Sequence, residues 1–222
     1  MTTATAALAD QLLDALPQTQ CTRCGYPDCR AYAAAIAAGE AEINQCPPGG
    51  AEGVARLAAL TQRAPLPLNP THGNEGPLRR ALIDEAWCIG CTLCIKACPV
   101  DCIVGGPKSM HTVITALCTG CELCLPVCPV DCIAMIDATP GRSGWAAWSA
   151  PQADQARERY AFRQFRIERD STEHAERLAA KAQSKLADVA SASKLTDPDD
   201  LQAKRAVIEA ALERARLRKE SP

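Results

Sequence analysis

The stretch that decides the fold occurs twice, as CIGCTLCIKACPVDCI over residues 88–103 and as CTGCELCLPVCPVDCI over residues 118–133. Each cysteine of the first copy recurs 30 positions later in the second copy, and so do Gly90, Leu93 and the run Pro99–Asp101. A repeat this regular predicts two copies of one supersecondary unit, related by a pseudo-twofold axis.

Each copy carries C-x2-C-x2-C-x3-C-P, the spacing that holds a [4Fe–4S] cluster. A cubane needs a thiolate at each of four corners, and three closely spaced cysteines on a tight loop supply three of them. The fourth thiolate must come from elsewhere in the chain. Zinc is the rival metal, but it favours paired C-x2-C knuckles with four ligands at one ion. Two runs of this spacing therefore favour iron–sulfur clusters.

Short apolar runs flank both cysteine loops and predict strands. Residues 80–84 and 111–115 lead into the loops, while residues 103–104 and 133–136 follow them. Gly105-Gly106-Pro107 predicts a turn between the halves, and Pro99–Asp101 predicts a brief helix. Short strands with a brief helix predict the α+β fold class.

This stretch resembles the bacterial two-[4Fe–4S] ferredoxin family, in which the cysteine before proline ligates the opposite cluster. The resemblance implies two ligand sets: Cys88, Cys91, Cys94 and Cys128 for one cluster, and Cys118, Cys121, Cys124 and Cys98 for the other. Cys102 and Cys132 are one cysteine too many in each copy. We predict that each is a small buried residue packing near its cluster; an alternative ligand role stays open.

A separate cysteine set precedes the repeat, in QCTRCGYPDCRAYAAAIAAGEAEINQCPPGG over residues 20–50. Its spacing is C-x2-C-x4-C-x16-C-P, formed by Cys21, Cys24, Cys29 and Cys46. Four cysteines suit one cubane, although a zinc site can use the same spacing. The alanine-rich segment 30–42 predicts a helix that carries the chain from the third cysteine to the fourth.

This part resembles the small [4Fe–4S] domain of the RnfB subunit of Rnf electron-transport complexes and of corrinoid iron–sulfur proteins. The predicted order is a small [4Fe–4S] domain (1–60), a linker (61–78) and a two-cluster ferredoxin domain (79–140), which is the order of RnfB. RnfB proteins typically begin with a hydrophobic anchoring helix. These 222 residues contain no such stretch, so we expect a soluble RnfB-like protein.

Residues 150–222 predict a C-terminal α-helical arm or hairpin, because they are rich in Ala, Arg, Glu, Lys and Gln and lack glycine. A first helix is expected over about 151–191. Asp197-Pro198-Asp199-Asp200 predicts the start of a second, with an N-cap, a proline at N1 and acids in the first turn. The arm has two interpretations: a docking surface for a redox partner, or a solvated tail.

Composition excludes several classes of function. The formal charge of −2 argues against nucleic-acid binding, and no phosphate-binding glycine motif occurs. No secretory signal is present, so the fourteen cysteines are expected in a reducing cytoplasm, where grouped thiolates indicate metal. We predict His111 as a surface strand residue, with a place beside a cluster as the alternative. Trp87 is interpreted as a shield for a cluster or as ordinary packing.

These observations predict an electron-transfer protein with three [4Fe–4S] clusters and no independent catalytic site. The expected partners are a reductase and an acceptor. The alternative function is a peripheral RnfB subunit of an Rnf-type ion-translocating oxidoreductase complex, with other Rnf subunits as partners, on the cytoplasmic face of the inner membrane.

Overall fold

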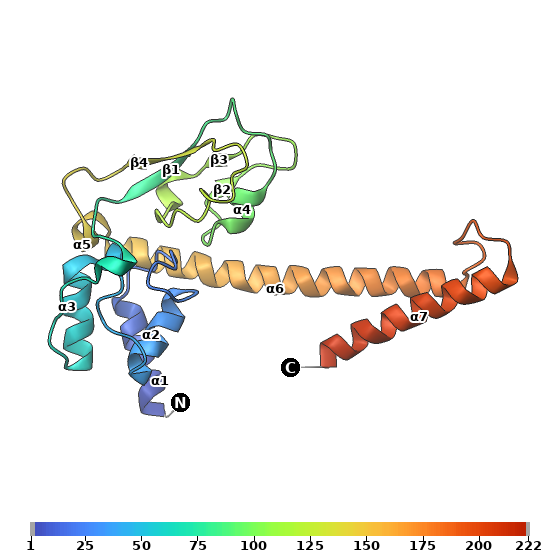
Figure 1. Ribbon diagram of the computed structural model, residues 1–222, viewed down its shortest axis with the longest axis horizontal. Coiled ribbons are helices and arrows are strands. Elements are labelled where there is room, and N and C mark those ends of the chain that lie inside the picture. Colours follow the sequence, from blue (N-terminus) through green and yellow to red (C-terminus); the bar gives the residue numbers. More distant parts are fainter. Residues whose placement is uncertain (1–2, 221–222) are drawn as a thin grey trace. The chain divides into compact units, whose positions relative to one another are not determined.

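The computed structural model describes residues 3–220; the ends of the predicted small domain and arm, residues 1–2 and 221–222, lie outside the described residues. The chain divides into two compact units, Met1–Arg163 and Gln164–Pro222. Helices and short strands occur together in the first unit, which confirms the predicted α+β class. Figure 1 draws the small domain in blue and cyan and the repeat module (residues 79–140) in green to yellow.

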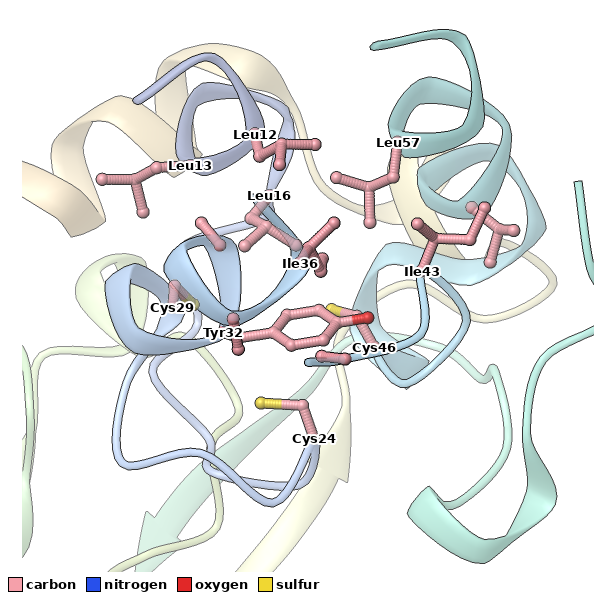
Figure 2. Close-up of a cluster of buried hydrophobic side chains, with 14 of the residues drawn as sticks. Leu12, Leu13, Leu16, Cys24, Cys29, Tyr32, Ile36, Ile43, Cys46 and Leu57 are labelled. Atoms are coloured by element: carbon pink, nitrogen blue, oxygen red, sulfur yellow. The ribbon is translucent and has the colours of Figure 1, made fainter. Parts of the chain in front are cut away.

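The small domain is helical and has its own core. It consists of α1 (Thr3–Ala15), α2 (Cys29–Ala38), a 3-10 turn at Pro47–Gly49 and α3 (Gly50–Thr61). Leu12, Tyr32, Ile43 and Leu57 are at most 1% exposed and meet between the helices (Figure 2). The helix expected over 30–42 stops at Ala38, because Gly39 adopts a left-handed conformation with φ of 76° and caps it.

The linker between the small domain and the repeat module is held by hydrogen bonds. The Asn44 side chain donates to the carbonyl oxygen of Pro67 at 2.7 Å. The Glu75 carboxylate accepts from the backbone N–H of Ala51 at 2.8 Å and from the hydroxyl of Ser143 at 2.6 Å. These contacts fix the linker against segments on both of its sides in the sequence.

Two antiparallel ladders form the sheet structure of the repeat module. β1 (Arg79–Ile83) pairs with β4 (Ile133–Asp137), and β2 (Ile103–Val104) pairs with β3 (Thr112–Val113). Ile83 lies opposite Ile133, and Val113 lies opposite Ile103. Val113 stands 30 positions after Ile83, and Ile103 stands 30 positions before Ile133. Corresponding residues of the two copies therefore pair in both ladders, so the ladders have the same register.

The glycine of each cysteine loop is required by the backbone segment that lies against it. Gly90 and Gly120 have φ values of 68° and 70°. A Cβ at Gly120 would lie 2.4 Å from the carbonyl oxygen of Arg79, and one at Gly90 would lie 2.5 Å from the nitrogen of Ser109. Only glycine fits so close to a neighbouring backbone at positive φ, which explains its recurrence in both copies.

The brief helix of the repeat occurs before Pro99 rather than at Pro99–Asp101, so that prediction was wrong. α4 spans Leu93–Ala97 and ends where the ring of Pro99 removes an N–H donor. The second copy has only turns at the corresponding positions, 123–127. Pro126 stands there in place of Lys96, whose backbone N–H donates to the carbonyl oxygen of Thr92 at 3.2 Å in the first copy.

The chain leaves the repeat module through α5 (Gly144–Ala147) and enters α6 (Ala150–Ala187). Trp148, between them, is buried and donates its indole N–H to the carbonyl oxygen of Pro17 at 2.8 Å. Arg159 donates to the carbonyl oxygens of Val100 at 2.7 Å and Asp101 at 2.9 Å. Residues 150–163 of α6 therefore belong to the first unit with the cysteine loops.

The second unit contains the rest of α6 and α7 (Pro198–Glu220). Asp197 caps α7, since its carboxylate accepts from the N–H of Asp199 at 2.8 Å, as its sequence predicted. α6 ends at Ala187, four residues before the expected end at Ser191. Within residues 3–220, no helix combines the length and apolar character needed to cross a membrane.

Two shortened chains test where the first unit ends. A chain ending at Arg163 should keep the thermal midpoint of the full chain, whereas one ending at Trp148 loses both Arg159 hydrogen bonds. Hydrogen bonds from a charged donor contribute about 1.5 kcal/mol each, so the loss is about 3 kcal/mol, or about 6–12 °C at this size. Anaerobic melts followed by circular dichroism measure the midpoints; equal midpoints would contradict the assignment of residues 150–163.

Candidate functional site

The small domain contains four buried cysteines, three of which lie around one aromatic ring. Cys21, Cys24, Cys29 and Cys46 are each 8–9% exposed. Figure 2 shows Cys24, Cys29 and Cys46 around Tyr32. The Tyr32 hydroxyl donates to the carbonyl oxygen of Glu42 at 2.7 Å and accepts from the N–H of Gln45 at 3.1 Å. Tyr32 thus holds the segment that returns the chain to the fourth cysteine.

The start of α2 fixes the third cysteine of this set. Asp28 is the N-cap, and its carboxylate accepts from the N–H of Ala31 at 2.7 Å. The N–H of Cys29 donates to the side-chain oxygen of Gln20 at 2.9 Å. Cys29 is therefore the first residue of a capped helix, where the positive end of the helix dipole favours a thiolate.

Burial is the largest influence on the pKa values of Cys24, Cys29 and Cys46, and it raises all three. It raises the pKa of Cys29 to about 12, with the neighbouring Cys21 and Cys24 adding to the shift. Burial likewise raises the pKa of Cys46 well above its usual value, followed by the charges of Cys29 and Cys21. The neighbouring cysteines are thus close enough for their charges to raise the pKa values of Cys24, Cys29 and Cys46 further. Thiolates in such a site need a cationic partner, as metal ligands do.

The repeat module encloses two cavities lined by cysteines. The Cys118 cavity is lined by Cys98, Cys102, Cys118, Cys121 and Cys124 together with Ala81, Val100 and Met135. The Cys88 cavity is lined by Cys88, Cys91, Cys94, Cys128 and Cys132 together with Ile83, His111 and Ile133. The cysteine before proline crosses over in both: Cys98 lines the cavity of the second copy, and Cys128 lines that of the first.

The five thiols of each cavity are distributed around its wall. Among residues 3–220, no three or more His, Cys, Asp or Glu side chains form a group that could hold a single metal ion. The rest of each lining is chiefly apolar.

Cys102 is buried and hydrogen-bonded to two cysteines of the Cys118 cavity, Cys98 and Cys118. Its sulfur lies 3.4 Å from that of Cys98, which also accepts from the backbone N–H of Cys102 at 3.3 Å. Hydrogen bonding from the Cys102 thiol lowers the pKa of both Cys98 and Cys118 to about 6. The same bonds raise the pKa of Cys102 itself. Cys102 thus contacts two thiols whose pKa values are lowered while its own is raised.

Cys132 repeats this contact in a more open position. Its sulfur lies 3.5 Å from that of Cys128, and its side chain is half-buried. Burial and the Cys128 thiol raise its pKa to about 12. The two additional cysteines therefore each contact the cysteine before proline of their own copy.

His111 lies inside the Cys88 cavity, so its predicted surface position was wrong. It is 1% exposed, and its Nδ1 lies 3.3 Å from the sulfur of Cys94. Its backbone N–H donates to the sulfur of Cys88 at 3.3 Å. Ala81, 30 positions earlier, donates its N–H to the sulfur of Cys118 at 3.4 Å. The 30-residue offset relates His111 to Ala81, but it does not show that the imidazole is buried.

Trp87 does not shield a cluster or pack in a core, because 70% of it is exposed. Both sequence interpretations of this residue were wrong. Trp148 and Trp145 do anchor the chain before α6: Trp148 bonds to Pro17, and Arg56 lies 3.9 Å over the ring of Trp145.

The small domain and the repeat module meet at their cysteine loops. The Thr119 hydroxyl, next to Cys118, donates to the carbonyl oxygen of Thr19 at 3.0 Å. Glu122, next to Cys121, forms a 2.7 Å ion pair with Arg23 and a second ion pair with Arg79. Thr19 and Arg23 belong to the segment that carries Cys21 and Cys24. The first cysteine set therefore lies on the Cys118 side of the repeat module.

Two family models match the chain. The one described as "4Fe-4S dicluster domain" matches residues 81–135, and the one described as "Putative Fe-S cluster" matches residues 16–48. These ranges contain the two repeat copies and the first cysteine set. No solved structure matches the chain significantly.

Curated relatives share one name, that of the RnfB subunit of the ion-translocating oxidoreductase complex. The protein from Azoarcus sp. is 62% identical over 107 residues, covering 48% of this chain and 58% of the relative. Those from Alkalilimnicola ehrlichii and Stutzerimonas stutzeri are each 56% identical, covering 69% and 66% of this chain and 83% and 75% of their own lengths. The match thus spans less than two thirds of the length of the Azoarcus protein and more than two thirds of the length of each of the other two.

The resemblance to RnfB predicted from cysteine spacing is confirmed by these identities, which reach well beyond the cysteines themselves. The chain belongs to the RnfB family of ion-translocating oxidoreductase complexes.

Proposed function

We propose that this chain relays single electrons through three [4Fe–4S] clusters, as the RnfB component of an Rnf-type ion-translocating oxidoreductase complex. The observation that carries the proposal is the crossover of Cys98 and Cys128. Each cavity of the repeat module has three closely spaced cysteines of one copy and the cysteine before proline of the other, with Cys102 or Cys132 as a fifth lining cysteine. This crossover is the arrangement of two-cluster ferredoxins. Soft thiolates in apolar surroundings suit iron–sulfur clusters.

The ligand sets follow from these groupings. Cys21, Cys24, Cys29 and Cys46 would hold the first cluster; Cys88, Cys91, Cys94 and Cys128 the second; Cys118, Cys121, Cys124 and Cys98 the third. The equal register of the β1–β4 and β2–β3 ladders supports a pseudo-twofold relation between the second and third sites. A bound cluster supplies one-electron storage. The chain excludes water from it and donates backbone N–H groups to its thiolates, as Ala81 and His111 do.

The contacts between cysteine loops favour one order of relay. The Thr119–Thr19 hydrogen bond and the Glu122–Arg23 ion pair join the loop of the first set to the loop of Cys118. The Cys88 cavity has no such contact with the first set among those described for residues 3–220. We propose that the third cluster stands between the other two, so that an electron crosses the chain in the order first, third, second, or the reverse.

The proposed partners are a low-potential one-electron donor protein and the remaining subunits of the complex. Association would be peripheral, on the cytoplasmic face of the inner membrane. Residues 1–150 carry a formal charge of −4 from nine basic and thirteen acidic residues, and each oxidised cluster with its thiolates adds roughly −2. An acidic surface of this kind steers encounters with basic partner surfaces at low salt.

Metal analysis tests the cluster count. The full chain, purified without oxygen, should contain about twelve iron atoms and about twelve acid-labile sulfides, since each [4Fe–4S] cluster holds four of each. Zinc at one to three equivalents with no sulfide would contradict the proposal.

The variants Cys98→Ser and Cys102→Ser separate ligands from their neighbours. Cys98→Ser should lose about four iron atoms or shift one cluster potential, because serine is a harder ligand than thiolate. The affected cluster should be the one in the Cys118 cavity. Cys102→Ser should keep all its iron and cost at most about 1–3 kcal/mol if the hydroxyl is unpaired. Iron analysis and low-temperature EPR distinguish the two; the opposite pattern would refute the ligand sets.

Membrane fractionation tests membership of a complex. In cells that contain the other subunits, the chain should sediment with membranes at low salt and be released at high salt, because screening weakens contacts between charged surfaces. The same chain expressed without those subunits is the control and should stay in the supernatant. Equal distribution in both cells would favour a free electron carrier instead.

A further inference from the structure

The two halves of the repeat module differ at one pair of facing positions. Ala81 lies opposite Met135 in the ladder of β1 and β4. In the other half, His111 corresponds to Ala81 and Gly105 corresponds to Met135, each at an offset of 30. This second pair stands one position past the end of the β2–β3 pairing. A small residue thus faces a large one in both halves. The large residue follows the cysteine loops in one half (Met135) and lies between them, before Cys118, in the other (His111).

The glycine is what admits the imidazole. Gly105 has a φ of 144°, and a Cβ there would lie 2.5 Å from Cδ2 of His111. In the other half, Ala81 and Met135 both line the Cys118 cavity. Met135 offers a thioether, which is only a weak acceptor. The Cys88 cavity therefore has a side chain able to donate a hydrogen bond where the Cys118 cavity has none from this pair.

The ring has one available partner. Nδ1 lies 3.3 Å from the sulfur of Cys94, and Nε2 is buried without a partner among residues 3–220. A cysteine that ligates iron is a thiolate and brings no proton, so the hydrogen of this bond must come from Nδ1. The neutral tautomer with hydrogen on Nδ1 leaves only an acceptor unpaired at Nε2, which buried sites tolerate better than an unpaired donor.

We propose that His111 is a positioning residue that donates this hydrogen bond to Cys94 and so raises the reduction potential of the cluster in the Cys88 cavity. The proposal rests on the proposed function, since it requires a cluster there. Reduction adds one electron and one negative charge to the cluster and its thiolates. A donor to a thiolate binds more strongly as that charge grows, so it stabilises the reduced form. The imidazole thereby adds to the difference between the two sites that the unequal burial of Cys102 and Cys132 already makes.

Three variants of the full chain isolate the donor. His111→Leu removes it at a similar side-chain volume, while His111→Asn restores an N–H at the position of Nδ1. Every variant keeps the backbone N–H that donates to Cys88. Met135→Leu, at the corresponding pair of the other half, is the matched control. The chains are titrated without oxygen against dithionite with viologen mediators, and paramagnetic NMR follows the ligand cysteine β-protons of each cluster separately.

In His111→Leu, the ratio of reduced to oxidised cluster in the Cys88 cavity should fall about tenfold at a fixed potential, which is 59 mV for one electron. His111→Asn should recover most of this ratio, and Met135→Leu should leave it unchanged. Iron content should stay at the wild-type value. The other two clusters should move far less in the histidine variants.

The proposal is overturned if His111→Leu keeps its iron and its potential, or if the leucine and asparagine variants shift alike, since packing alone would then explain the effect. Loss of iron from His111→Asn would also overturn it, because a residue that only donates a hydrogen bond is replaceable by another donor. If the leucine variant does not hold its clusters, a tenfold fall in His111→Asn decides against the proposal. A wild-type chain without cluster signals would instead refute the proposed function.

Discussion

Each cavity of the repeat module is completed by a cysteine from the other copy, and this crossover constrains the rest of the first unit. Cys98 lines the cavity of the second copy, and Cys128 lines that of the first. The two ladders have equal register, and Gly90 and Gly120 let the backbone at Ser109 and Arg79 lie close to the cysteine loops. Neither copy would form a complete four-cysteine site alone. With the proposed ligand sets, folding and cluster binding would be coupled across both halves.

The small domain is tied to this module by few but specific contacts. Thr119 of the module donates to Thr19, Glu122 pairs with Arg23, and Trp148, which follows the module in the chain, donates to Pro17. All three lie close to a cysteine loop or to the segment leading into one. A hydrogen bond buried at such a contact resists sliding more than apolar packing does, because displacement leaves polar groups unpaired. The position of the first cysteine set relative to those of the repeat module is thus fixed by hydrogen bonds and an ion pair.

Local features of the sequence predicted the elements well, whereas the environment of single residues required the structure. Cysteine spacing and the 30-residue offset indicated the repeat, and the alanine-rich run after Cys29 indicated α2. His111 and Trp87 were both placed wrongly. Burial of one residue on a short strand depends on what crosses it, and Gly105 makes the space for His111. Lys96 and Pro126 explain why one copy is helical and the other is not.

The Gly105–His111 pair also restricts how two similar halves could diverge. In a chain built by duplication, both halves begin with the same residues at these facing positions. Any side chain at position 105 would overlap the imidazole, since even a Cβ would lie 2.5 Å from Cδ2. A histidine at position 111 of this backbone therefore requires glycine at position 105. Replacing that glycine alone would force the imidazole or the backbone around it to shift.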